Sequence, residues 1–213
     1  MTAQRTLIRR TALTVTAGVA ALVLTACGGG GHDMGSMDSE SSSGESATAS
    51  AEAGGHNDAD VSFATEMIQH HRQAVEMADL ADSRASSQEV KDLATKIKGA
   101  QDPEIKTMSG WLKAWGEEVP ADMSGMEGME GHDMPSMPGM MSSEDMDKLD
   151  KASGAEFDKM FLEMMVDHHE GAIEMARTEK ADGEYGPATK LADDVIAAQT
   201  AEIEQMDKML DKS

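Results

Sequence analysis

Hydrophobic residues recur with the spacing of an α-helix in two neighbouring stretches of the chain. From about Asp60 to Ala85 they fall on one face when successive residues are set 100° apart. This face holds Phe63, Met67, Ala74, Ala78 and Ala81. Ser86 or Ser87 can cap a second helix, in which Pro103 should cause local strain. The inward positions of that helix are Val90, Ala94, Ile97, Gln101, Ile105, Met108, Leu112 and Trp115.

The same pattern returns 98 residues later. Positions 60–112 align with positions 158–210 without a gap, and 17 of the 53 pairs are identical. We therefore expect a second pair of helices over about 154–180 and 187–210, after a short helix at 143–151. Each pair has one apolar stripe, which is best buried against the other pair. The sequence thus predicts an all-α fold, a four-helix bundle made of two repeated helical hairpins.

The first 26 residues have the pattern of an export signal. Three arginines precede an apolar run, residues 11–24, that is shorter than the roughly 20 residues of a membrane span. The Leu-Thr-Ala-Cys that ends at Cys27 resembles a bacterial lipobox. This pattern predicts cleavage before Cys27, lipidation of its sulfur, and a location on the extracytoplasmic face of the cell membrane. An ordinary signal peptide is the alternative, and export by the Sec or the twin-Arg route stays open.

Two segments of low complexity separate these parts. Residues 27–58 contain almost no large apolar side chain and should form a disordered, lipid-anchored tether. Residues 117–142 are rich in Met, Gly and Pro and should form a linker. The first hairpin then occupies 59–116, and the short helix with the second hairpin occupies 143–212. We expect 59–212 to be one domain.

The charge and cysteine content exclude several classes of protein. The formal net charge is -22, and such an acidic surface repels phosphate backbones, so we expect no nucleic-acid partner. A surface of this kind attracts cations. Cys27 is the single cysteine of the chain, which excludes a disulfide framework and a Cys-rich zinc site.

Each repeat carries two adjacent histidines beside its apolar face: His70 and His71, then His168 and His169. Burying unpaired polar groups costs about 1–3 kcal/mol each, so these imidazoles need partners. The candidate partners on the second helices are Gln101, Glu104, Gln199 and Glu202. They would either satisfy structural histidines or orient histidines that bind a metal. Metal ligands must be deprotonated, so binding should fade as the pH falls through the imidazole range near 6.5. The sequence does not decide whether His70 or His71 is the inner residue.

Methionine sulfurs are further candidate ligands. Met67, Met77, Met165 and Met175 lie on the histidine face, where packing is the commoner role of a methionine. The linker candidates are Met123, Met126, Met129, His132, Met134 and Met137. Residues 31–37 of the tether match residues 131–137 at six of seven positions. Thioethers on a chain without a core of its own suit a soft ion such as Cu(I) or Ag(I), and low-complexity drift is the alternative.

These motifs resemble the DUF305 family over roughly residues 57–212. The resemblance rests on Phe-x3-Met-x2-His-His-x2-Ala-x-Glu-Met-Ala at 63–78, on its counterpart at 157–172, and on Pro-Gly-Met-Met at 138–141. It implies a ferritin-like helical bundle that is usually exported. Some members are linked to copper handling, and no catalytic residues carry over.

The leading interpretation is therefore extracytoplasmic binding of copper, with Cu(I) favoured, for sequestration or hand-off. One alternative is a structural or interaction lipoprotein whose His and Met only pack the core. Another is a metal-dependent oxidoreductase, although the Glu-x-x-His pattern of di-iron bundles is missing. Met67 and Met165 stand three residues before His70 and His168, where that pattern has Glu. We therefore expect no enzymatic activity and no catalytic residues.

Overall fold

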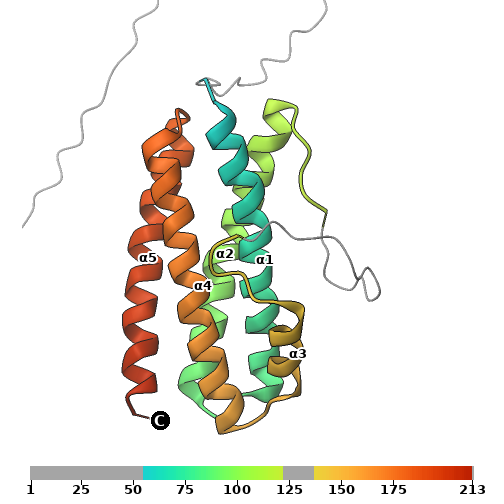
Figure 1. Cartoon of the computed structure of the whole chain (residues 1–213), viewed down its shortest axis with the longest axis vertical. Helices are drawn as coiled ribbons and strands as arrows, with labels where there is room; N and C mark the ends of the chain where they lie inside the picture. The colour runs from blue at the N-terminus through green and yellow to red at the C-terminus, as the bar shows by residue number, and fades with distance from the viewer. Residues whose placement is uncertain (1–54, 122–136, 213) are drawn as a thin grey trace, which may run out of the picture. The chain divides into compact units, whose positions relative to one another are not determined.

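The computed structural model describes residues 55–121 and 137–212, which lie in one compact unit. It contains the helices α1 (Asp58–Arg84), α2 (Gln88–Trp115), α3 (Ser143–Lys151), α4 (Ala155–Asp182) and α5 (Gly186–Leu210) (Figure 1). The predicted all-α class is confirmed for these two ranges, where four helices are long and one is short. Within them, no helix has the length and apolar content needed to cross a membrane. The signal sequence, Cys27 and residues 122–136 lie outside the described residues.

The long helices of each repeat pack against each other, α1 on α2 and α4 on α5, while α1 also packs on α4. Helices α2 and α5 lie further apart, and an ion pair between Lys96 Nζ and Glu202 Oε1 at 3.2 Å joins them. Short helix α3 lies against α1 and α4 (Figure 1). Its Leu149 is fully buried, and its Asp150 accepts a hydrogen bond of 2.9 Å from Arg84.

Local signals set the helix ends. Asn57 caps α1 in a capping box with Asp60, and Ser87 caps α2 through its hydroxyl. Gly116, at a φ of 84°, closes α2 because a left-handed residue favours glycine. Helix α2 continues through Pro103, so the proline that predicted local strain does not end it.

The aspartates at the start of α1 and α4, Asp60 and Asp158, explain part of the repeat. Asp158 accepts hydrogen bonds from the backbone nitrogens of Ser86 and Ser87, at 3.0 and 2.9 Å, in the turn between α1 and α2. Asp60 accepts a bond of 2.9 Å from the backbone nitrogen of Tyr185, in the turn between α4 and α5. Each hairpin therefore holds the turn of the other.

The apolar core falls into two clusters. One contains Ala74, Met77, Val90, Ile97, Phe157, Phe161, Met165 and Met206 among its members. The other contains Phe63, Met67, Met108, Leu112, Ala172, Met175 and Val195 among its members. Every long helix contributes to both clusters and passes from one to the other at buried polar residues. These are His70, His71, Gln101, His168, His169, Gln199 and Glu202, and with Glu104 we refer to them as the polar layer.

One buried carboxyl pair lies away from this layer. Glu179 is fully buried beside Asp60, and its counterpart in the first repeat is Ala81. Burial raises the pKa of Glu179 to about 8, and the neighbouring carboxylate of Asp60 adds to the rise. Burial also acts to raise the pKa of Asp60, but the hydrogen bonds that it accepts lower this pKa by more. Glu179 is therefore the protonated partner at neutral pH.

This assignment predicts a pH-dependent effect of Glu179→Gln. A carboxyl whose pKa rises from 4.5 to about 8 on folding costs stability increasingly as the pH rises from 4.5 to about 8, because the unfolded chain loses this proton first. The variant should match the wild type below pH 4.5 and become increasingly more stable than the wild type up to about pH 8, as measured by urea unfolding. Glu174→Gln, at an exposed position of the same helix, is the control and should show no such trend. A constant difference between Glu179→Gln and wild type across this range would contradict the assignment.

Candidate metal centre

The four histidines of the repeats meet in the polar layer. His70, His71 and His169 have no exposed surface, and His168 is 1% exposed. The rings of His70 and His168 lie against each other across the interface between α1 and α4, with centroids 3.8 Å apart and planes 42° apart. The rings of His71 and His169 instead contact the second helix of their own hairpin. Both members of each pair are therefore inside, with different surroundings.

Two glutamates hold His71 and His169. The Nε2 atom of His71 lies 2.6 Å from Oε2 of Glu104, and that of His169 lies 2.9 Å from Oε2 of Glu202. A carboxylate oxygen only accepts hydrogen bonds, so the hydrogen of each neutral ring is on Nε2. The lone pair is then on Nδ1. A metal-binding histidine commonly donates its other ring N–H to a carboxylate in this way.

His70 is fixed by a backbone carbonyl, while His168 is not fixed by a hydrogen bond. The Nε2 atom of His70 lies 3.0 Å from the carbonyl oxygen of Pro138, so it also carries the hydrogen. Neither ring nitrogen of His168 has a well-formed hydrogen bond to the described part of the chain. Among the described residues this leaves five ring nitrogens without a partner: Nδ1 of His70, His71 and His169, and both nitrogens of His168.

Burial disfavours the charged form of three of these imidazoles. Burial, with a smaller contribution from the neighbouring His71, lowers the pKa of His70 to about 3. Burial likewise lowers the pKa of His168 and of His169, although the hydrogen bond to Glu202 partly offsets this effect at His169. The loss of ligands expected near pH 6.5 therefore moves to lower pH at these three rings.

The predicted partners on α2 and α5 all reach the polar layer, where only the glutamates bond to imidazoles. Gln101 and Gln199 are 3% and 4% exposed. Both polar atoms of the Gln101 amide and Oε1 of Gln199 lack a partner within the described ranges. Burying such groups unpaired is unfavourable, so the layer has unused capacity for hydrogen bonding or coordination.

The helical methionines flank the polar layer. Met67, Met77 and Met165 are fully buried and Met175 is 8% exposed, and all four pack in the apolar clusters. Packing is thus one role of each, and coordination stays a prediction. The linker candidates Met123, Met126, Met129, His132 and Met134 lie outside the described residues. Met137 is only 6% exposed, so the argument that linker sulfurs have no core to pack in does not hold for it.

Sequence reasoning missed that residues 137–141, which we call the strap, pack on the helices. Gln73 donates to the carbonyl of Met141 at 2.9 Å and accepts from its amide at 2.7 Å. Gly139 lies against Gly171, where even a Cβ atom would not fit. The repeat alignment contains one clue, because Gln73 pairs with Gly171 directly before the identical pair Ala74 and Ala172.

The arrangement limits the kind of metal site that is possible. In the described ranges, no group of three or more His, Cys, Asp or Glu side chains is placed to hold a metal ion. The available donors are neutral imidazole nitrogens, with thioethers close by in the chain. Soft ions that accept low coordination numbers, Cu(I) and Ag(I), match such donors best.

The unpaired state of His168 predicts unequal costs of removing neighbouring histidines. In metal-free protein, His168→Leu should change the free energy of unfolding by less than about 1 kcal/mol or be stabilising, because it leaves no partner unpaired. Relative to the wild type, the variant should be more stable at pH 5 than at pH 7.5. The lowered pKa of His168 costs the wild type stability as the pH falls below 6.5, and the variant lacks this histidine. His169→Leu should cost about 1–3 kcal/mol because Glu202 loses a hydrogen bond while buried. Equal costs in urea unfolding would contradict the assigned hydrogen bonds.

Comparison with known proteins gives the same fold. A DUF305 protein of Streptomyces coelicolor that is inferred to be secreted has a solved structure with a TM-score of 0.64 and 32% identity, covering 72% of this chain and 93% of that chain. A DUF305 fragment from Deinococcus radiodurans has a TM-score of 0.64 and 25% identity, covering 74% and 98%. No curated protein matches the chain.

Structures of CopM in metal-bound forms are also similar. The Cu(I)-bound form has a TM-score of 0.59 and 34% identity, and the Cu(II)-bound form has a TM-score of 0.60 and 38% identity. Each covers 72% of this chain and 96% of its own chain. CopM has a silver-bound structure as well. The family model described as "Domain of unknown function (DUF305)" matches residues 60–210, and the chain therefore belongs to the DUF305 family.

Proposed function

We propose that this protein binds copper, with Cu(I) favoured and Ag(I) as a surrogate, at the imidazoles of the polar layer. The observation that carries the proposal is the set of five unpaired ring nitrogens on four buried histidines. Leaving so many buried nitrogens without partners is unfavourable unless something binds them. The similarity to CopM, whose structures contain copper or silver, supports this choice of metal.

The ligand set follows from the tautomers. Nδ1 of His70, His71 and His169 and either nitrogen of His168 are the candidate primary ligands, and no more than two of these rings would bind any one ion in the described arrangement. Glu104 and Glu202 act as orienting groups, and Gln101 and Gln199 as further polar neighbours. The thioethers of Met67, Met77, Met165 and Met175 complete the site where a ring nitrogen does not reach. Neutral nitrogen and sulfur donors favour Cu(I) over harder ions.

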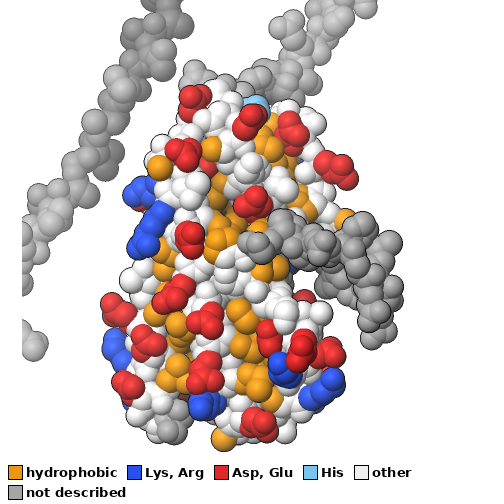
Figure 2. Space-filling view, viewed as in Figure 1, with side chains coloured by type: hydrophobic (Ala, Val, Ile, Leu, Met, Phe, Trp, Pro, Cys, Tyr) orange, Lys and Arg blue, Asp and Glu red, His pale blue; other side chains and the backbone are white. Residues whose placement is uncertain are grey.

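We further propose a location outside the cytoplasm, with the four long helices forming a ferritin-like bundle anchored to the membrane through lipidated Cys27. The inferred secretion of the Streptomyces coelicolor relative supports export. Acidic side chains are spread widely over the visible face, with few basic ones between them (Figure 2). Such a surface raises the local concentration of cations.

In this proposal the Met-rich linker captures the ion and the bundle holds it. Met123, Met126, Met129, His132, Met134 and Met137 supply mostly thioethers on a Gly- and Pro-rich segment. Ordering such a segment around an ion costs conformational entropy, so its affinity should be modest. Modest affinity suits hand-off more than storage.

The alternative, a helical module whose His and Met only pack the core, is favoured by one observation. All four helical methionines are buried in apolar clusters. This alternative does not account for the unpaired nitrogens of His168, so the two readings differ in what histidine substitution does to metal binding.

The first test is His70→Ala combined with His168→Ala, in protein carrying Cys27→Ser so that no thiol competes. Loss of two ligands should weaken Cu(I) binding to the bundle by at least about tenfold in competition titrations. Circular dichroism should show that helicity is kept. Met108→Leu combined with Met206→Leu, at two fully buried core methionines that the proposal does not use as ligands, is the control for core packing and should leave the Cu(I) affinity unchanged. Unchanged Cu(I) affinity with lost helicity would favour the structural alternative.

The second test concerns the linker. Because burial lowers the pKa of His70 to about 3 and also lowers the pKa of His168 and His169, acidity alone does not separate bundle sites from linker sites. Replacing Met123, Met126, Met129, Met134 and Met137 with Leu keeps the bulk and removes the sulfur. Fewer Cu(I) or Ag(I) ions should then bind per chain, with thermal unfolding unchanged. Equal stoichiometry in the two proteins would show that the linker is a spacer.

A further inference from the structure

The strap crosses α1 and α4 beside the tilted rings of His70 and His168. Figure 1 shows the segment that leads into α3 passing across these two helices. Its Met141 makes two hydrogen bonds to the side chain of Gln73, and its Pro138 carbonyl accepts from His70. The strap therefore contacts the polar layer directly.

Two glycines seat the strap. Gly139 has a φ of 74°, and a Cβ atom there would lie 2.6 Å from the carbonyl oxygen of Asp167. A Cβ atom at Gly171 would lie 2.0 Å from the carbonyl oxygen of Pro138. Gly171 aligns with Gln73 in the repeat, so one helix provides space and the other provides the hydrogen bonds. The contacts at Gln73 and Gly171 thus accommodate the strap in one orientation.

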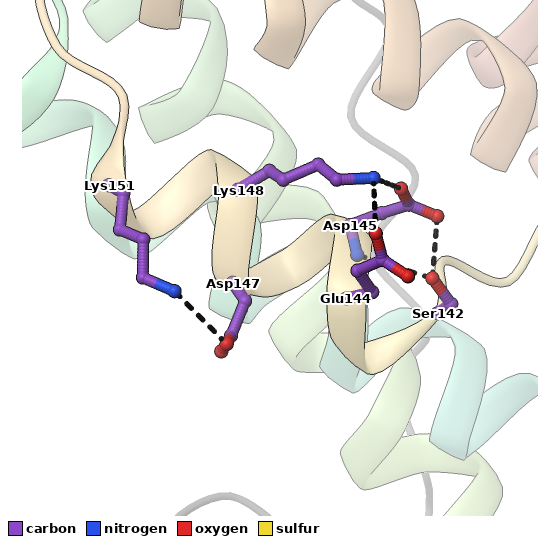
Figure 3. Close-up of polar contacts among 6 residues, drawn as sticks. All are labelled: Ser142, Glu144, Asp145, Asp147, Lys148 and Lys151. Carbon is purple, nitrogen blue, oxygen red and sulfur yellow. Dashed lines mark hydrogen bonds and ion pairs between the residues drawn. The ribbon is translucent and has the colours of Figure 1, made fainter.

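Helix α3 ties down the C-terminal end of the strap. Ser142 follows the strap directly and caps α3, where Lys148 pairs with Glu144 and Asp145 and Lys151 pairs with Asp147 (Figure 3). These pairs are exposed and weak, whereas Leu149 is fully buried in an apolar cluster. The strap is thus held at Gln73, at Gly171 and through α3.

The carbonyl of Pro138 accepts a hydrogen bond from Nε2 of His70, just as a glutamate does for His71 and for His169. Each acceptor fixes the hydrogen on Nε2 and leaves the lone pair on Nδ1. Without the strap, a neutral His70 ring could adopt either tautomer. Among the described residues His168 has no such acceptor, so the strap makes the two neighbouring rings unequal.

We propose that the strap is part of the metal centre, with Pro138 as the positioning residue that sets the tautomer and orientation of His70. The strap also fixes the end of the Met-rich linker next to the His70–His168 pair. The metal role rests on the proposed function, whereas the tautomer is a property of the metal-free protein.

The test uses Gly171→Ala in the full-length chain with Cys27→Ser, labelled with ¹⁵N at histidine. The control is Gly99→Ala, another helical glycine, at which an added Cβ atom meets nothing within 4 Å. In wild type and control, NMR should show His70 with hydrogen on Nε2 alone. In Gly171→Ala the two tautomers should mix, and the Met141 amide should exchange its hydrogen faster. The affinity for Ag(I) should fall about 10–100-fold, as for other losses of an orienting group.

Gln73→Leu is a second variant in case Gly171→Ala does not fold, because it removes the hydrogen bonds to Met141 and keeps the glycine contact. An unchanged His70 tautomer in a variant whose Met141 amide exchanges freely would overturn the positioning role. A mixed tautomer with unchanged Ag(I) affinity would overturn the place of the strap in the metal centre. If the wild type binds no Ag(I) at the bundle, the proposed function fails while the tautomer result still stands.

Discussion

The constraint on which this structure depends is the burial of four imidazoles between two apolar clusters. Buried rings cannot be charged without a large cost, and their polar atoms require partners that the helices alone do not supply. Glu104 and Glu202 come from the second helices to meet this need for two rings, and the backbone of Pro138 meets it for a third. The fourth ring, His168, is left without one among the described residues, and this imbalance gives the layer its capacity to bind a ligand.

The duplication explains how the two hairpins hold each other, and departures from the repeat explain why the polar layer is asymmetric. Asp60 and Asp158 hold the turns of opposite hairpins, so each repeat stabilises the other. Two departures matter. Glu179 adds a protonated carboxyl at one end only, and the strap binds one face of the layer only. A symmetric four-histidine arrangement becomes a centre with four different environments.

Much of the fold could be predicted from the sequence, because helical periodicity and the repeat are local or self-similar signals. The approach of the paired histidines to the core and of Glu104 to the layer both follow from spacing on a helix, whereas spacing did not decide which histidine of a pair is the inner one. The contact of the strap with His70 could not be predicted from the sequence, because the acceptor at Pro138 is a backbone carbonyl and every residue has one. The lowered pKa values of His70, His168 and His169 did not follow either, since a pKa depends on burial by distant segments. Met137 was misjudged because local composition does not reveal the burial of a side chain.

The central claim is that ring nitrogens of the polar layer bind the metal. The most direct measurement is NMR of the chain with Cys27→Ser, labelled with ¹⁵N at histidine and titrated with one equivalent of ¹⁰⁹Ag(I). The account predicts that ring nitrogens of the layer histidines lose the shift of an unprotonated nitrogen and show scalar coupling to silver. If all four layer histidines keep their metal-free spectra while only methionine methyl signals move, the imidazole layer is structural and the account is contradicted.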